Sequence, residues 1–204
     1  MKFPLFLVIF VCFLFITRQR SRRAEEKNRQ SIDDFWEREA SANTTLPKDI
    51  SNLPYVDFSG IVLPFACFPD DILAECEAQV KHLSEQKILN LTGISNTDLK
   101  LAYGPSNLTQ LSSYDENFTL LVRTLNRWGH RLYELSFSTQ AQTVLEFAVS
   151  IGSDIKATYS LLLTIYQETG NSEKISSLKL SASQLNSLMK QPILKLLSGN
   201  PAVD

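Results

Sequence analysis

The chain contains few of the residues on which common enzyme motifs depend. Its 204 residues include seven Gly, three Cys and two His. Among so few glycines there is no G-x-G-x-x-G dinucleotide motif, no Gly-rich phosphate loop and no G-x-S-x-G nucleophile motif. Neither His82 nor His130 belongs to an H-E-x-x-H pattern or stands near a C-x-x-C pair, so a zinc site lacks ligands. The sequence therefore predicts no catalysis, no metal and no cofactor.

Other scarce features narrow the fold class. Eight Pro and seven Gly are too few for the many tight turns of an all-β protein. Cys12, Cys67 and Cys76 permit one disulfide at most, so we expect free thiols rather than a disulfide framework. The 20 basic and 22 acidic residues nearly cancel, and no basic, aromatic-rich stretch predicts nucleic-acid binding. Because 44% of the residues are apolar, the chain can bury a core.

The clearest signal that is present is an unbroken apolar run from Phe3 to Ile16. As a helix it spans about 21 Å, short of a hydrocarbon core of about 30 Å. Arginine side chains that follow the run can snorkel and extend the effective span. No small-x-small cleavage site follows it. We expect residues 1–17 to form a single uncleaved transmembrane anchor, and a cleaved signal peptide is the alternative.

A basic cluster follows the predicted anchor. Six Lys or Arg stand against two Glu between Arg18 and Arg29, whereas Lys2 alone precedes the run. The larger basic cluster stays in the cytoplasm. We therefore predict a single-pass protein of the cell membrane with a cytoplasmic C-terminal domain. The side chains expected to contact the lipid headgroups are Arg18, Arg20, Arg22, Arg23 and Trp36.

Changes in composition divide the chain into five segments. The stretch after the anchor lacks Gly and Pro, so the helix can continue, and Ile32, Phe35 and Trp36 share one face of it. That face packs either at the membrane interface or on the domain. The next stretch holds four prolines, which break a helix. The predicted segments are 1–17 anchor, 18–45 charged juxtamembrane helix, 46–69 extended linker, 70–198 helical domain and 199–204 tail.

Four apolar stripes at helical spacing lie between Tyr114 and Leu197. The connections are short, and Gly152 and Gly170 mark two of the stops, so consecutive helices should be antiparallel neighbours. The sequence thus predicts an all-α fold of antiparallel helix pairs, an α-solenoid fragment preceded by a single transmembrane helix and an extended linker. The stripes begin at Phe118, Ala141, Ile155 and Ile175.

Ala148 and Ala182 lie 34 residues apart, each near the end of the second helix of a pair. On this spacing the chain resembles the tetratricopeptide repeat, a 34-residue helix pair, over about one third of its length. The sequence departs from the repeat pattern at Leu163 and Ile175, and neither unit ends in proline. The residues that match preferred positions of the repeat are Gly129, Ala141, Ala148, Tyr159, Leu162, Tyr166, Gly170 and Ala182.

In that family the first helix of each unit lines a concave binding groove. The resemblance implies that Arg123 and Arg127 face such a groove, where charge-assisted hydrogen bonds could hold an acidic protein partner. An ordinary solvated polar face is the alternative. The predicted partner-binding residues are Arg123, Asn126, Arg127, His130, Ser160, Thr164 and Gln167.

These observations predict a membrane-anchored helical scaffold or adaptor that binds a protein partner, contacts lipid through its anchor and performs no catalysis. One alternative is an accessory structural subunit of a membrane complex, working through the Ile32, Phe35 and Trp36 face. The other is an extracytoplasmic, signal-bearing binding protein. Four Asn-x-Thr sequons would suit the last, because they accept glycans in a secreted chain. We expect them to act as caps and turns, at Asn43, Asn90, Asn107 and Asn117.

Overall fold

A computed structural model describes residues 3–199 of the chain. Within its first helix, the side chains of residues 3–8, 11–12, 21–25 and 27–28 lie outside the described part. The chain divides into two compact units. The first unit comprises Met1–Lys48 and Asn96–Ser106, and the second comprises Asp49–Ser95 and Asn107–Asp204.

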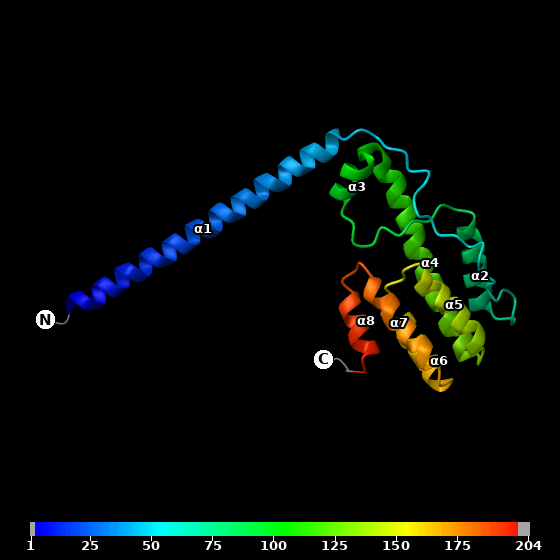
Figure 1. Cartoon of the computed structure of the whole chain (residues 1–204). Helices are drawn as coiled ribbons and strands as arrows, with labels where there is room; N and C mark the ends of the chain where they lie inside the picture. The colour runs from blue at the N-terminus through cyan, green and yellow to red at the C-terminus, as the bar shows by residue number, and fades with distance from the viewer. Residues whose placement is uncertain (1–2, 200–204) are drawn as a thin grey trace. The chain divides into compact units, whose positions relative to one another are not determined.

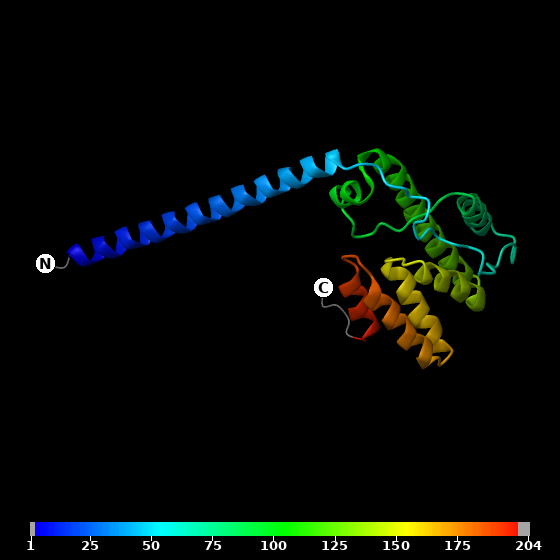
Figure 2. The same ribbon diagram turned by 45° about the horizontal axis from the view of Figure 1, so that its top comes forward.

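The first unit is built from α1 (Phe3–Thr44) and α3 (Asn96–Tyr103). Helix α1 runs through 42 residues without a break (Figures 1 and 2), as expected for a sequence that has no Gly or Pro after the apolar run. Its predicted continuation past the basic cluster is therefore confirmed. Ala42, near its end, is fully buried.

Polar contacts hold α3 against the last turns of α1. The Glu39 carboxylate accepts hydrogen bonds from the Thr97 hydroxyl, at 2.7 Å, and from the Lys100 ammonium group. Arg38 forms an ion pair with Asp98. The side chains of Glu39 and Lys100 are mostly buried, at 20% and 17% exposure, so this pair is shielded from water. Two neighbouring charges of α1 are thus neutralised within the first unit.

Among the described residues, none of the helices combines the length and the apolar character needed to cross a membrane. The predicted anchor, residues 1–17, is described only in part. Residues 1–2 are not described, nor are the side chains of 3–8 and 11–12. The side chains of the run that are described, such as Ile9 and Phe13, are exposed. The transmembrane anchor therefore stays a prediction.

All regular secondary structure among the described residues of the second unit is helical, with no strand, and the all-α class is confirmed. The linker over residues 49–69 is mainly irregular, with short turns and bends and no strand, and its partly buried side chains, including Val56, Phe58 and Ile61, pack on the core. A 3-10 turn, Pro105–Asn107, precedes α4. The helices are α2 (Asp71–Ser84), α4 (Leu108–Glu134), α5 (Ser138–Ser150), α6 (Lys156–Glu168), α7 (Ser172–Gln184) and α8 (Lys190–Leu197).

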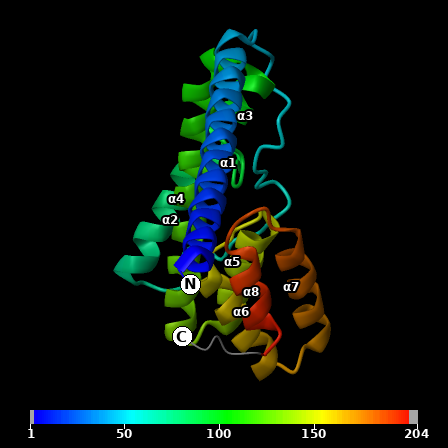
Figure 3. The same ribbon diagram turned by 90° about the vertical axis from the view of Figure 1, so that its left-hand side faces the viewer.

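Helix α4 lies at the centre of the second unit and contacts α2, α5 and α6. Its Trp128, Leu125 and Leu132 are fully buried. Helix α5 in turn contacts α6 and α7, and α6, α7 and α8 lie side by side (Figure 3). The predicted stripes are confirmed as the buried faces of α4 to α7, because almost every member of each stripe has little or no exposed surface.

Helices α4 and α5 approach closely at Gly129. A Cβ atom at this position would lie 2.5 Å from the Cδ2 and Cγ atoms of Leu145, closer than real contacts allow. The three matched alanines, Ala141, Ala148 and Ala182, have no exposed surface. Small residues therefore stand where the repeat resemblance expects helices to touch. Membership of the repeat family itself stays a prediction.

Replacing Ala148 or Ala182 with leucine should lower the free energy of unfolding by about 1–3 kcal/mol, because the added atoms overpack a filled core. The same change at exposed Gln184, also on α7, should cost less than about 0.5 kcal/mol. Urea denaturation followed by circular dichroism measures both. If leucine lowered the free energy of unfolding equally at the three positions, the helices would not touch closely at Ala148 and Ala182.

Candidate functional site

The polar face of α4 that the sequence predicted as a groove is divided between two neighbouring helices. Arg127 donates from Nη2 to Oε2 of Glu75 on α2, at 2.8 Å. Asn126 instead accepts a hydrogen bond from the hydroxyl of Thr158 on α6, at 3.0 Å. Arg123 is exposed and has no ion pair among the described residues. Arg127 therefore lies toward α2, and Asn126 lies toward α6.

His130 is less accessible than predicted. Its Nε2 atom is buried and has no hydrogen-bond partner among the described residues. A partner protein could not reach this nitrogen without a local rearrangement, so His130 contributes little to a surface that binds by polar contacts. The adjacent Trp128 likewise has a buried Nε1 without a described partner.

The predicted residues of α6 stand apart from the arginines. Ser160, Thr164 and Gln167 are all exposed. The Thr164 hydroxyl donates to the backbone carbonyl of Ser160, one turn earlier on the same helix, at 3.2 Å. Among the described residues, no hydrogen bond joins these three side chains to the α4 set. The hydrogen bond between α4 and α6 comes instead from Thr158, a buried residue that the sequence analysis missed.

The ion pair between Arg127 and Glu75 is open to solvent. The two side chains keep 52% and 65% of their surface exposed. The hydrogen bond from Arg127 lowers the pKa of Glu75 and in turn raises that of the guanidinium group. Exposed pairs of this kind contribute little to stability. A carboxylate on a partner protein could therefore replace Glu75 at low cost.

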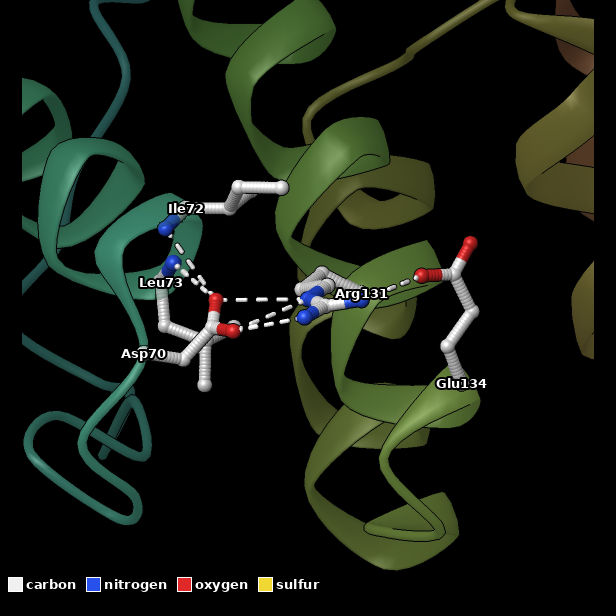
Figure 4. Close-up of polar contacts among 5 residues, drawn as sticks. All are labelled: Asp70, Ile72, Leu73, Arg131 and Glu134. Carbon is white, nitrogen blue, oxygen red and sulfur yellow. Dashed lines mark hydrogen bonds and ion pairs between the residues drawn. The ribbon is translucent and has the colours of Figure 1, made fainter.

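A stronger polar contact lies one turn further along α4 (Figure 4). Asp70 caps α2 by accepting from the backbone N–H groups of Ile72 and Leu73, each at 3.1 Å. Arg131 donates to the same carboxylate from Nε at 3.2 Å and from Nη2 at 2.6 Å. Its Nη1 donates to Glu134 at 3.0 Å. This fork-shaped pairing fixes the start of α2 against α4, so its role is structural.

The pKa of Asp70 is lowered, first by the hydrogen bond from Arg131 and then by the backbone donors of α2. A carboxyl whose pKa is lower in the folded state stabilises the fold above its unfolded pKa, about 3.9 for aspartate. That contribution disappears as the pH falls through the folded pKa. Changing Asp70 to asparagine keeps a capping oxygen and removes the charge.

We expect Asp70→Asn to unfold at a lower urea concentration than the parent at pH 7. The difference between the two urea midpoints should disappear as the pH falls below about 3.9. Asp71→Asn is the matched control, since Asp71 is exposed and has no described ion pair. Its difference from the parent should be smaller at pH 7. If the difference in urea midpoint between Asp70→Asn and the parent stayed constant at pH values below the folded pKa of Asp70, the lost charge pairing with Arg131 would not be its cause.

The membrane-facing residues are placed only in part. Arg18 and Arg20 are exposed, whereas the side chains of Arg22 and Arg23 lie outside the described residues. Trp36 is exposed and packs edge-on against the ring of Phe35, with 5.4 Å between the ring centroids.

The continuous helix also sets how far Trp36 lies from the apolar run. Trp36 follows Ile16 by 20 residues, about 30 Å along a helix axis. The headgroup layer on one side of a bilayer is only about 5–8 Å thick. If α1 crosses a membrane upright, Trp36 stands beyond the headgroups. Its position then favours contact with protein over contact with lipid.

A second polar cluster joins three helices beside a cavity of about 320 Å³. Oε1 of Glu146 on α5 accepts from the Tyr166 hydroxyl at 2.7 Å and from the Lys174 ammonium at 2.6 Å. Burial and this carboxylate raise the pKa of Tyr166. The sequence analysis missed the cluster because its members come from three separate helices. Val149, Leu162 and Leu178 form the apolar part of the cavity wall.

The described residues outside these clusters offer neither a metal site nor an activated thiol. Among the described residues, no group of three or more His, Cys, Asp or Glu is placed to hold a metal ion. Cys67 and Cys76 are free thiols, and burial raises the pKa of both. A raised pKa keeps a thiol protonated near neutral pH and weakens it as a nucleophile.

No protein-family model, curated protein or solved structure matches this chain. Its function has to be argued from its own residues and their arrangement.

Proposed function

We propose that the chain is a membrane-anchored helical scaffold or adaptor that binds a protein partner and performs no catalysis. One observation carries the proposal. A single unbroken helix, α1, joins the apolar run to the basic cluster and then to three large apolar side chains that face solvent. These side chains are Ile32, Phe35 and Trp36. Large exposed apolar groups on an otherwise charged helix indicate a contact with another molecule.

The anchor in this proposal rests on the sequence. The run from Phe3 to Ile16 contains no polar or charged residue, and basic residues follow it at once. Six Lys or Arg between Arg18 and Arg29 favour a cytoplasmic position for everything that follows. The proposed location is the cell membrane, with one span and the second unit in the cytoplasm.

The second unit supplies the body of the scaffold. Its consecutive helices are packed through small buried residues, which supports a fold like that of the tetratricopeptide repeat without requiring membership of the family. Arg123 and Arg127 form the proposed binding surface for an acidic partner. The solvent-exposed pairing of Arg127 with Glu75 supports this role, because such a pair exchanges readily.

A second candidate function is an accessory structural subunit of a membrane complex. The distance of Trp36 from the apolar run favours it, since about 30 Å places this side chain at the level of cytoplasmic parts of neighbouring proteins. The two candidates differ in the surfaces that partners use. The adaptor binds through α4 in addition to the exposed face of α1, whereas the structural subunit uses α1 alone.

Crosslinking in intact membranes, followed by recovery of the chain and identification of adducts, tests the proposal. The chain should remain in the membrane fraction after a carbonate wash, and protein adducts should form. Loss of adducts in Trp36→Ala alone would favour the structural subunit, and loss in an arginine double variant would favour the adaptor. Complete release by carbonate, together with no protein adduct, would contradict the proposal.

The double variant Arg123→Ala and Arg127→Ala should abolish capture of an acidic partner while its melting temperature stays near that of the parent. Both side chains are exposed, so neither contributes much to folding. Capture by the parent should weaken as salt rises, because exposed charges are screened within about 8–10 Å. Recovery of the same partners by the double variant would remove the α4 surface from the proposal.

A further inference from the structure

The face formed by Ile32, Phe35 and Trp36 on α1 has no cover among the described residues. The three side chains expose 47%, 53% and 63% of their surface. Helix α3 packs on the part of α1 that follows them, at the paired charges of Arg38 and Glu39, and leaves this face open. We call these three residues the α1 apolar face; Phe35 and Trp36 each lie one turn after Ile32.

Acidic side chains border the α1 apolar face. Asp33 and Glu37 are one turn apart and lie on the edge next to Trp36, and Asp34 lies further round the helix. All three are exposed, and none forms an ion pair among the described residues. The nearest basic residue toward the anchor, Arg29, is also exposed and is not paired with Asp33. The α1 apolar face is therefore bordered by acidic side chains. A complementary partner surface is apolar and bordered by basic side chains.

A second copy of the chain does not fit this margin. Two copies anchored in one membrane have the same orientation, so each residue stands at the same height as its counterpart. Asp33 and Glu37 of one copy would meet the same acidic residues of the other. Arg29, one turn nearer the membrane than Asp33, is the nearest basic residue on that side, and it is one positive charge against the two negative charges of Asp33 and Glu37 in each copy.

The small area of the face indicates where its partner resides. Each of the two aromatic side chains can bury about 150–250 Å², so the face falls short, even with Ile32, of the roughly 800 Å² that each side of a stable soluble interface contributes. Confinement of both molecules to one membrane raises their effective concentration and can compensate for a small contact. Cytoplasmic segments next to membrane spans are also rich in Lys and Arg.

We infer that the α1 apolar face docks a Lys- and Arg-bearing amphipathic helix of another membrane protein, at a level about 24–32 Å beyond Ile16. This inference rests on the proposed function and specifies its partner. The apolar residues of the partner helix cover Phe35 and Trp36, and its basic residues face Asp33 and Glu37.

Trp36 itself reports this docking. The chain has two tryptophans, and Trp128 is already fully buried. The full chain is reconstituted in vesicles of zwitterionic lipid with a synthetic probe, a poly-leucine span that continues into a Leu/Lys amphipathic helix. A second probe carries Glu in place of Lys, and a third carries Ser in place of the cytoplasmic Leu. The emission of Trp36→Phe is subtracted as the background from Trp128.

The Leu/Lys probe should shift the Trp36 emission to shorter wavelength, with an affinity about two- to thirtyfold above that of the Leu/Glu probe, as two exposed ion pairs provide. The double variant Asp33→Asn and Glu37→Gln should remove that preference. Both variants should keep the parent's helicity, since the changed side chains are exposed. Equal shifts with the Leu/Lys and Leu/Glu probes, or an equal shift with the Ser/Lys probe, would overturn the inference.

A photo-crosslinking residue placed at position 36 tests the partner class in native membranes, with one at position 127 in parallel. Adducts with a basic cytoplasmic segment of a membrane protein support the inference. Adducts with a second copy, with lipid or with an acidic soluble protein overturn it. Protein adducts at 127 with none at 36 refute this inference alone. No protein adduct at either position refutes the proposed function as well.

Discussion

Replacing Trp128 with alanine is expected to lower the free energy of unfolding by about 3–5 kcal/mol. Trp128, in the C-terminal part of α4, is fully buried, with its ring 5.3 Å from that of Phe65 in the linker before α2. Its removal leaves a cavity that helices packed on three sides cannot collapse to fill. Because small proteins have only about 5–15 kcal/mol of stability, the variant should melt far below the parent.

The other tryptophan is the matched control. Trp36→Ala removes the same atoms at a position that is 63% exposed, so it should change the free energy of unfolding by less than about 0.5 kcal/mol. Thermal and urea denaturation of the two variants in parallel measure the difference. Similar losses in both would mean that α4 is not the core of the second unit.

The second large effect is expected in the apolar run. Changing both Ile9 and Phe13 to lysine should release most of the chain from carbonate-washed membranes. Each lysine near the middle of a transmembrane helix costs about 2.5–3.5 kcal/mol, so the pair lowers the partition into the membrane by about four orders of magnitude. Because the run is already short for a bilayer, its remaining apolar residues cannot compensate for two buried charges.

Ile9→Val with Phe13→Leu is the control for the lysine pair. It changes the same two positions, keeps them apolar and should leave the chain in the membrane fraction. Retention of the lysine variant in the pellet at the level of this control would show that the run from Phe3 to Ile16 does not hold the chain to the membrane.

Local patterns in the sequence account for much of the second unit. The buried faces of α4 to α7 follow from apolar spacing, because a helix that covers a core needs one apolar stripe. The cap at Asp70 follows from the preference of aspartate for helix starts. The repeat resemblance also implied small residues where helices touch, and at Gly129 an added Cβ atom would lie only 2.5 Å from the Leu145 side chain.

The contacts that the sequence did not predict join residues far apart in the chain. Arg131 reaches Asp70 across 61 positions, and Glu39 reaches Lys100 across 61 positions. Local spacing does not encode which helix becomes a neighbour, so α3 was placed with the helical domain instead of with α1. For the same reason the sequence could not foresee that Arg127 would pair with Glu75 of α2.

The side of the membrane on which the second unit lies decides whether this chain is a cytoplasmic scaffold. Expression with microsomes, followed by protease added from outside, measures it directly. We predict that the second unit is digested and that no glycan is attached at Asn43, an exposed sequon at the end of α1. Protection of the second unit together with glycosylation of Asn43 would contradict the proposal and indicate an extracytoplasmic protein.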